Sequence, residues 1–179
     1  MRTIRFSFAS CTPCAFISPA LLLAGSILAG CISFGAKPSD AKSNAYVVAK
    51  PAAPWEPTDP GTMDLAYRMP EDGSTLSLNS VCEQYQKNSL EELRTSSLAG
   101  IGIEKRITER SLTVGGYPAL ESVVVGRLDG ALFKLAHTVL RTPTCVYDIS
   151  FVSRPETFET HEALYASFLA SFHEREPSS

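Results

Sequence analysis

Five cysteines and three histidines are the side chains that could give this 179-residue chain a nucleophile, a redox pair or a metal ligand. Cys11 and Cys14 are spaced as C-x-x-C, a pattern that suggests a redox pair when it occurs in a cytosolic βαβ unit. Here the pair falls inside an uncharged N-terminal segment, with no flanking strand or helix to activate a thiol. We therefore expect no redox chemistry from these two residues.

His137 is the strongest catalytic candidate among the histidines. It shares strand parity with Leu135 and Val139, so its side chain is expected to point toward the covered face of a sheet. No serine or carboxylate is placed by the sequence to form a triad with it. His161-Glu162 does not complete an H-E-x-x-H metal motif either. The sequence therefore predicts no catalytic residue, no cofactor site and no metal site.

The N-terminal segment has the layout of an export signal. Arg2 and Arg5 form a positive n-region, and residues 15–29 form an apolar h-region of suitable length. The segment ends in Leu28-Ala29-Gly30-Cys31, which resembles the lipobox of bacterial lipoproteins. The resemblance implies that residues 1–30 are a lipoprotein signal peptide. It also implies that Cys31 is the lipidated first residue of the mature chain, joined by a thioether to diacylglycerol and bearing acyl chains such as palmitate.

The alternative for this segment is an uncleaved transmembrane anchor, because the uncharged run over 6–36 exceeds the ~20 residues of a spanning helix. Pro13 and Pro19 weaken that alternative. In both cases the positive end stays in the cytoplasm and the rest of the chain is exported. By resemblance, Ile32 stands where enteric lipoproteins retained at the inner membrane have Asp. This implies a lipid-anchored protein of the cell envelope, at the outer membrane and facing the periplasm.

The overall charge of the chain limits its partners. Lys and Arg total 16 against 19 Asp and Glu, a net charge of −3, which does not fit a basic nucleic-acid-binding protein. We expect no nucleic-acid partner. The expected partners are the membrane, through the lipid anchor, and a protein or a small apolar ligand.

Cys82 and Cys145 remain once Cys31 is lipidated, an even number in a compartment where thiols tend to be oxidised. Each lies at the edge of a strand-like run, so neighbouring strands could bring their Cα atoms within the ~5.5 Å that a disulfide requires. We predict a disulfide between them. The alternative is that both are small buried hydrophobic residues.

Residues 31–61 are predicted to be a lipidated flexible tether. They are rich in Ala, Ser, Lys and Pro, and four of the twelve prolines lie between Pro51 and Pro60. A flexible segment of this length has a root-mean-square reach of about 30 Å. Trp55, the only Trp, lies within it, either docked on the domain or a partner or loosely ordered.

We predict that residues 62–174 form one α+β globular domain with the element order β-β-α-β-β-β-β-α. Turn residues and alternation predict strands within 65–69, 74–82, 103–114, 119–127, 133–139 and 145–152. Ser89 and Glu92 form a capping box for a helix that ends at Gly100. A second helix is predicted from an apolar stripe comprising Phe158, His161, Tyr165, Phe168 and Phe172. Residues 175–179 are predicted to be a disordered tail.

Several turn and packing motifs of this domain are similar to those of small bacterial lipoproteins with the PsbP-like fold. They are Gly115-Gly116-Tyr117-Pro118-Ala119, Leu128-Asp129-Gly130 and Cys145-Val146-Tyr147-Asp148. The resemblance implies an antiparallel β-sheet with helices packed on it. Members of that group are mostly accessory, scaffold or assembly proteins, so it also implies a non-enzymatic accessory or binding role, with no catalytic residues to transfer.

The alternative function is an envelope hydrolase whose site is built from dispersed residues around His137, such as Asp148 and Glu121. The two functions make different structural predictions. Convergence of these side chains in a deep pocket would favour the enzyme. Their separation on different faces would favour the binding module.

Overall fold

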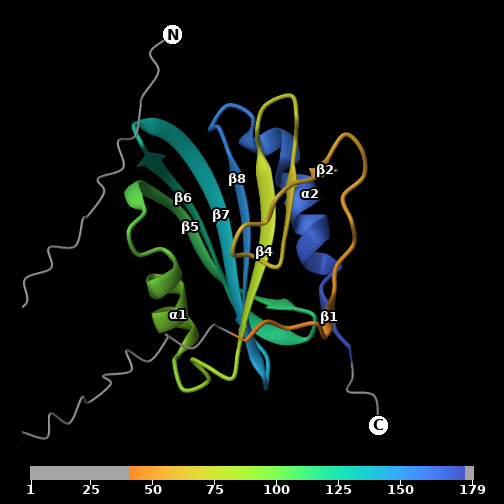
Figure 1. Ribbon diagram of the computed structural model, residues 1–179. Coiled ribbons are helices and arrows are strands. Elements are labelled where there is room, and N and C mark those ends of the chain that lie inside the picture. The colour runs from red at the N-terminus through yellow and green to blue at the C-terminus, as the bar shows by residue number, and fades with distance from the viewer. Residues whose placement is uncertain (1–40, 176–179) are drawn as a thin grey trace, which may run out of the picture. The chain divides into compact units, whose positions relative to one another are not determined.

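The computed structural model describes residues 41–175, which form a seven-stranded antiparallel sheet with one helix on each side (Figure 1). The predicted signal peptide, Cys31, the first part of the predicted tether and residues 176–179 lie outside the described residues. The sheet has the strand order β2-β3-β4-β8-β7-β6-β5, and a separate two-stranded ribbon pairs β1 with β9. The predicted class, an antiparallel α+β domain, is confirmed.

The described elements follow the predicted order, with three additional two-residue strands. The strands of the large sheet are β2 (Glu56–Pro57), β3 (Leu65–Arg68), β4 (Thr75–Cys82), β5 (Gly102–Val114), β6 (Tyr117–Leu128), β7 (Ala131–Arg141) and β8 (Cys145–Ser153). The ribbon consists of β1 (Tyr46–Val47) and β9 (His173–Glu174), and the helices are α1 (Leu90–Ser97) and α2 (Phe158–Ala170).

Strands β5 to β8 form the predicted meander, because short turns join each strand to the next. Gly115 and Gly116 have φ angles of 58° and 87°, and Asp129 and Gly130 have φ angles of 50° and 83°. Gly adopts this left-handed region freely, and Asp tolerates it, so both hairpins follow from residue type. Strand β4 pairs antiparallel with its sequence neighbour β3 on one side and with the distant strand β8 on the other.

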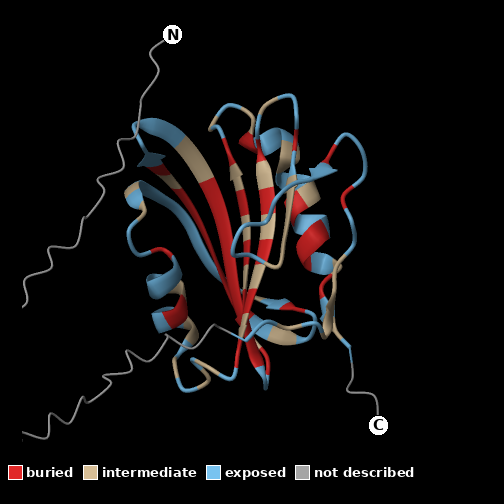
Figure 2. Ribbon diagram, viewed as in Figure 1, coloured by how far each residue is buried: buried red, intermediate tan, exposed pale blue. Residues whose placement is uncertain are grey.

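Alternation along the strands gives the sheet two buried faces with different helices on them. The face covered by α2 bears the main core, which includes Leu76, Leu78, Tyr147, Ile149, Phe151, Phe158, Tyr165 and Phe168. The face covered by α1 bears two smaller clusters, around Leu93 and around Leu98. We call these the α2 face and the α1 face. Figure 2 shows the buried residues running along the middle strands, while β5 is largely exposed.

Helix α1 begins where the capping box predicts. The Ser89 hydroxyl accepts a hydrogen bond from the Glu92 backbone N–H, and the Glu92 side chain accepts one from the Ser89 N–H at 2.7 Å. Helix α2 is shorter than the predicted stripe, because it ends at Ala170. Phe172 nevertheless belongs to the core and is 1% exposed. Within residues 41–175, no helix is long and apolar enough to cross a membrane.

The structure corrects the predicted tether, because residues 41–61 are packed against the domain. β1 pairs with β9 and β2 pairs with β3. Trp55 is only 5% exposed and lies edge-on to Phe151 and His161, with ring centroids 6.4 and 5.4 Å apart. The composition suggested a tether because the apolar residues of the arm formed by residues 41–61 recur at no regular spacing. Its order comes instead from two aromatic side chains, Trp55 and Tyr46, that pack on the core, and from the pairing of β1 with β9 and of β2 with β3.

Candidate functional site

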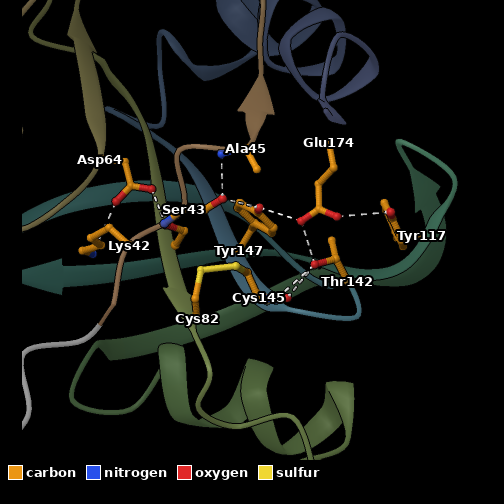
Figure 3. Close-up of a disulfide and its surroundings, with 11 residues drawn as sticks. Lys42, Ser43, Ala45, Asp64, Cys82, Tyr117, Thr142, Cys145, Tyr147 and Glu174 are labelled. Carbon is orange, nitrogen blue, oxygen red and sulfur yellow. Dashed lines mark hydrogen bonds and ion pairs between the residues drawn. A yellow bond between two sulfur atoms is a disulfide. The ribbon is translucent and has the colours of Figure 1, made fainter. Parts of the chain in front are cut away.

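The two cysteines predicted to pair form a disulfide (Figure 3). Cys82 ends β4 and Cys145 begins β8, and the two are register partners with Cα atoms 4.0 Å apart. Both are buried, at 8% and 4% exposure, within the main core. The disulfide therefore links the end of β4 to the start of β8, two neighbouring strands of the large sheet, and is structural.

A cluster of hydroxyl groups around one carboxylate lies beside this disulfide. Tyr147 donates to Glu174 Oε1 at 2.7 Å, Thr142 donates to the same oxygen at 2.8 Å, and Tyr117 donates to Oε2 at 3.2 Å (Figure 3). The Tyr147 hydroxyl also lies 2.8 Å from Ser43 Oγ. Burial raises the pKa of Tyr147, which keeps its donor proton in place. This cluster joins both ends of the described chain to the sheet and is structural.

His137 and Asp148 are brought together on the α1 face, as the alternative function requires. His137 Nε2 lies 3.1 Å from Asp148 Oδ1, and Ser97 donates its hydroxyl to the same oxygen at 2.8 Å. In a hydrolase triad the histidine lies between the serine and the acid. Here the acid lies between the serine and the histidine. The Ser97 hydroxyl proton therefore points to the carboxylate, and His137 is not placed to take it.

The third residue of the alternative site, Glu121, lies on the opposite side of the sheet. Glu121 pairs in register with Thr138, whose hydroxyl bonds Tyr165 of α2 at 2.6 Å. His137 is the next residue along β7, so it faces the other way. The three residues therefore do not converge on one site. The alternation of residues along each strand could not show this, because it does not give the register between strands.

A groove on the α2 face has a volume of about 590 Å³ and lies between α2 and the strands β5, β6 and β7. We call it the α2 groove. The sheet contributes Arg110, Leu112 and Val114 of β5, Glu121 and Val123 of β6, and Ala136 of β7. The helix contributes Glu159, Glu162, Ala163, Ala166, Leu169 and Ala170. Its volume lies within the range of small-molecule pockets.

The groove exists because one helix cannot cover so wide a sheet. Seven strands span roughly 29 Å at ~4.8 Å per spacing, whereas a helix with its side chains is only about 10 Å across. α2 packs its aromatic residues over β8 and β4. Its neighbouring stripe, toward β5 and β6, is made of small residues such as Ala163, Ala166 and Ala170. Small side chains do not fill the space, so the inner side of β5 and β6 stays accessible.

One end of the α2 groove is polar. The Nε of Arg110 donates to Glu121 Oε1 at 2.7 Å, and the Glu121 side chain is only 5% exposed. The hydrogen bond and the charge of Glu121 raise the pKa of Arg110. Tyr165, also in the lining, is fully enclosed, and burial raises the pKa of its hydroxyl. The Arg110–Glu121 pair is thus a fixed charge pair at the edge of an otherwise apolar surface.

The other end of the groove is mainly apolar. Val114, Leu169 and Ala170 line it, together with Gly115. A Cβ added to Gly115 would lie 2.7 Å from the backbone oxygen of Phe172, so the two backbones are in close contact there. Only glycine permits this approach. The groove therefore runs from a charged mouth to a mainly apolar end, where β5 and the C-terminal side of α2 meet.

The sequence analysis missed the α2 groove residues, although a signal for them was present. Glu159, Ala163, Ala166 and Ala170 recur at spacings of four, three and four, and Glu162 lies four before Ala166, so they form a second helical stripe beside the aromatic one. A stripe of small residues next to a core stripe indicates a helix that is not closely packed on that side. Arg110 and Glu121, in contrast, could be paired only from the register of β5 and β6.

The described residues contain no group of three or more His, Cys, Asp or Glu side chains that could hold a metal ion. The charged side chains of the groove lining lie at one end, and the rest of the lining is mainly apolar, with Thr113 and Tyr165 as its other polar residues. This arrangement suits noncovalent binding of a molecule with a polar end and an apolar body.

Comparison with known proteins gives structural similarity alone. No protein-family model matches the chain, and no curated protein matches it. Among solved structures, LpqN of Mycobacterium tuberculosis, described as involved in cell envelope biogenesis, has a TM-score of 0.57 at 12% identity. The match covers 76% of this chain and 87% of LpqN.

A protein from Bacteroides thetaiotaomicron VPI-5482 has a TM-score of 0.56 at 12% identity, covering 75% of this chain but only 46% of the other, so this chain spans about half of that protein's length. PsbP (CyanoP) from Synechocystis sp. PCC 6803 is 11% identical over 73% of this chain and 82% of its own, with a TM-score of 0.46. The first two similarities show a shared antiparallel α+β fold.

Proposed function

We propose that this protein is a non-enzymatic binding or accessory protein of the cell envelope that holds a small apolar ligand in the α2 groove. The observation that supports this most directly is the groove itself, with a volume of about 590 Å³, a mainly apolar end and one fixed charge pair at its mouth. A largely preformed apolar cavity with few placed polar groups is typical of ligand sites.

The hydrolase alternative has less support. His137, Asp148 and Glu121 lie on two faces of the sheet, and the Ser97–Asp148–His137 contacts have the acid in the middle. Saturable hydrolysis of ester or peptide substrates that is lost in a folded His137→Gln variant would overturn the binding proposal. Absence of turnover in both forms is the result expected from it.

We also propose that Cys31 anchors the protein by lipid, at the outer membrane and facing the periplasm. The lipobox-like Leu28-Ala29-Gly30-Cys31 supports this proposal. The description of LpqN as involved in cell envelope biogenesis supports only the cell-envelope part of this proposal, as an analogy between proteins of one fold. Two or more acyl chains give stable attachment, whereas one alone gives marginal attachment.

The groove proposal can be tested with an uncharged fluorescent probe. N-phenyl-1-naphthylamine becomes fluorescent in apolar surroundings, and we expect it to bind saturably to the full chain. Ala166→Trp places a large side chain in the lining and should weaken binding at least about tenfold, because the volume is occupied. Thr160→Trp is the matched control, since Thr160 is an exposed α2 residue outside the lining. Equal binding by both variants would show that the ligand does not lie in the groove.

A further inference from the structure

We propose that the α2 groove binds a single-chain zwitterionic amphiphile of the lysophospholipid kind. Its anionic group would lie on Arg110, its ammonium group on Glu162, and its chain in the apolar half of the groove. This inference rests on the proposed function and adds the chemistry of the ligand. It follows from which charged and hydrogen-bonding groups at the mouth of the groove already have partners among residues 41–175 and which do not.

Arg110 presents an available set of donors at the mouth. Its Nε is fixed at 2.7 Å from the buried carboxylate of Glu121, which orients the planar guanidinium. The two η nitrogens of Arg110 have no partner among residues 41–175, and its side chain is 62% exposed. A guanidinium held in this way can bind a phosphate or carboxylate through two parallel hydrogen bonds.

Glu162 presents the complementary charge. Two glutamates of α2 line the mouth, but Glu159 is already paired with Lys134 at 2.7 Å. Glu162 has no hydrogen-bond or ion-pair partner in the described part of the chain, and it is close enough to Arg110 for its charge to raise the pKa of that residue. The mouth therefore offers the two available η nitrogens of an arginine that is already ion-paired with Glu121, and beside them the carboxylate of Glu162. A head group with an anion next to an ammonium matches both charges, whereas a singly charged head group matches one and is repelled by the other.

The direction of the groove places the chain of the ligand. β5 runs from Arg110 to Val114, and α2 runs from Glu162 to Ala170, toward the same end, where Gly115 touches Phe172. Four residues of strand span about 13 Å and eight residues of helix span about 12 Å. The mainly apolar half thus extends far enough to hold a single alkyl chain, with the head group left at the charged mouth.

The test compares four probes that share a twelve-carbon chain and differ in the head group. They are dodecylphosphocholine, dodecyltrimethylammonium, dodecyl sulfate and dodecyl maltoside, each used below its micelle-forming concentration. Each probe displaces N-phenyl-1-naphthylamine from the full chain with Cys31→Ser, so that no covalent acyl chain competes. We expect the phosphocholine probe to bind about two- to fivefold more tightly than the others, the range for exposed ion pairs.

Charge variants then assign each half of the head group. In Arg110→Gln, the phosphocholine probe should lose its advantage over the trimethylammonium probe, while Arg110→Lys retains part of it. In Glu162→Gln, it should lose its advantage over the sulfate probe. Lys105→Gln and Glu156→Gln are matched controls, because both residues are exposed and outside the lining. The advantage should also shrink as salt rises from about 0.01 M to about 1 M.

The outcomes separate this inference from the proposed function. Equal affinity for all four probes, or a preference unchanged by the Arg110 and Glu162 variants, overturns the zwitterionic ligand and leaves the groove as an apolar site. Failure of both the naphthylamine and every twelve-carbon probe to bind overturns the proposed function itself.

Discussion

At the residue scale, Cys82 and Cys145 make the bond with the largest expected effect on stability. They are separated by 63 positions in the chain, so the disulfide closes a long loop. The chain-entropy account of such a loop gives about 4 kcal/mol of stabilisation, through the unfolded state. We predict that Cys82→Ala with Cys145→Ala lowers the free energy of unfolding by up to this amount, measured by urea denaturation. Titration of the denatured, unreduced mature protein should find no free thiol from this pair, and two reactive thiols would contradict the bond.

Asp72 links stability to pH on the α2 side of the molecule. Burial alone would raise the pKa of Asp72, but hydrogen bonds from the Ser74 backbone at 2.8 Å and from His161 at 2.9 Å outweigh burial and lower it. A carboxyl with a lowered pKa stabilises the folded state above its ordinary pKa. That contribution is lost as pH falls through the folded value.

The lowered pKa of Asp72 sets the direction of the effect expected for Asp72→Asn. The variant should be less stable than the parent at pH 7, and the difference should narrow as pH falls below about 4, the ordinary value for aspartate. Urea midpoints measured across this range provide the test. Glu71→Gln serves as the control, since Glu71 is the exposed neighbour in the same turn. A difference that stays constant down to low pH would show that Asp72 does not act through its charge.

At the element scale, the arm formed by residues 41–61 belongs to the fold, and Trp55 is its main contact. This side chain is 5% exposed and belongs to the same core cluster as Phe151. Replacing a buried large aromatic residue with alanine costs about 3–5 kcal/mol. We predict a loss of this size for Trp55→Ala, measured by far-ultraviolet circular dichroism during urea unfolding. Lys50→Ala, at an exposed position of the same arm, should change little. A loss in Trp55→Ala no larger than that of the Lys50 variant would mean that the arm does not dock in solution.

The two helices illustrate how far local pattern predicts an element. Ser89 and Glu92 predicted the start of α1, because a capping box involves only residues three apart. The aromatic stripe predicted α2 and the face that it buries. The stripe did not predict that the helix ends at Ala170, because Phe172 is buried by its place beside Tyr147 and not by helical phase.

At the scale of the whole molecule, the proposed lipid anchor can be tested apart from the groove. Cys31→Ser should abolish incorporation of labelled palmitate and move the protein from the membrane fraction to the soluble fraction. The reason is that a serine oxygen does not replace the thiolate in forming the thioether. Cys14→Ser is the control, because Cys14 lies in the predicted signal peptide. Undiminished labelling of the Cys31 variant would refute the assignment. Recovery of the parent entirely in inner-membrane fractions would contradict only the outer-membrane location.

The sequence by itself determined the local elements and their order. The turn at Asp129-Gly130, the alternation of β4 and the capping box at Ser89 each depend on residues within a few positions of one another. Short-range steric and hydrogen-bonding preferences are sufficient for such features. The antiparallel α+β class followed from the resulting order of strands and helices.

Only the tertiary structure decided which distant residues meet. β4 pairs with β8 across an intervening helix and three strands, and this is what sets Cys82 opposite Cys145. The register of β6 and β7 puts Glu121 opposite Thr138 and so on the other face from His137; a shift of one residue would reverse this. The α2 groove likewise depends on where one helix lies on a sheet too wide for it to cover. These features arise from long-range packing, in which each contact is fixed by many others, and no local pattern encodes them.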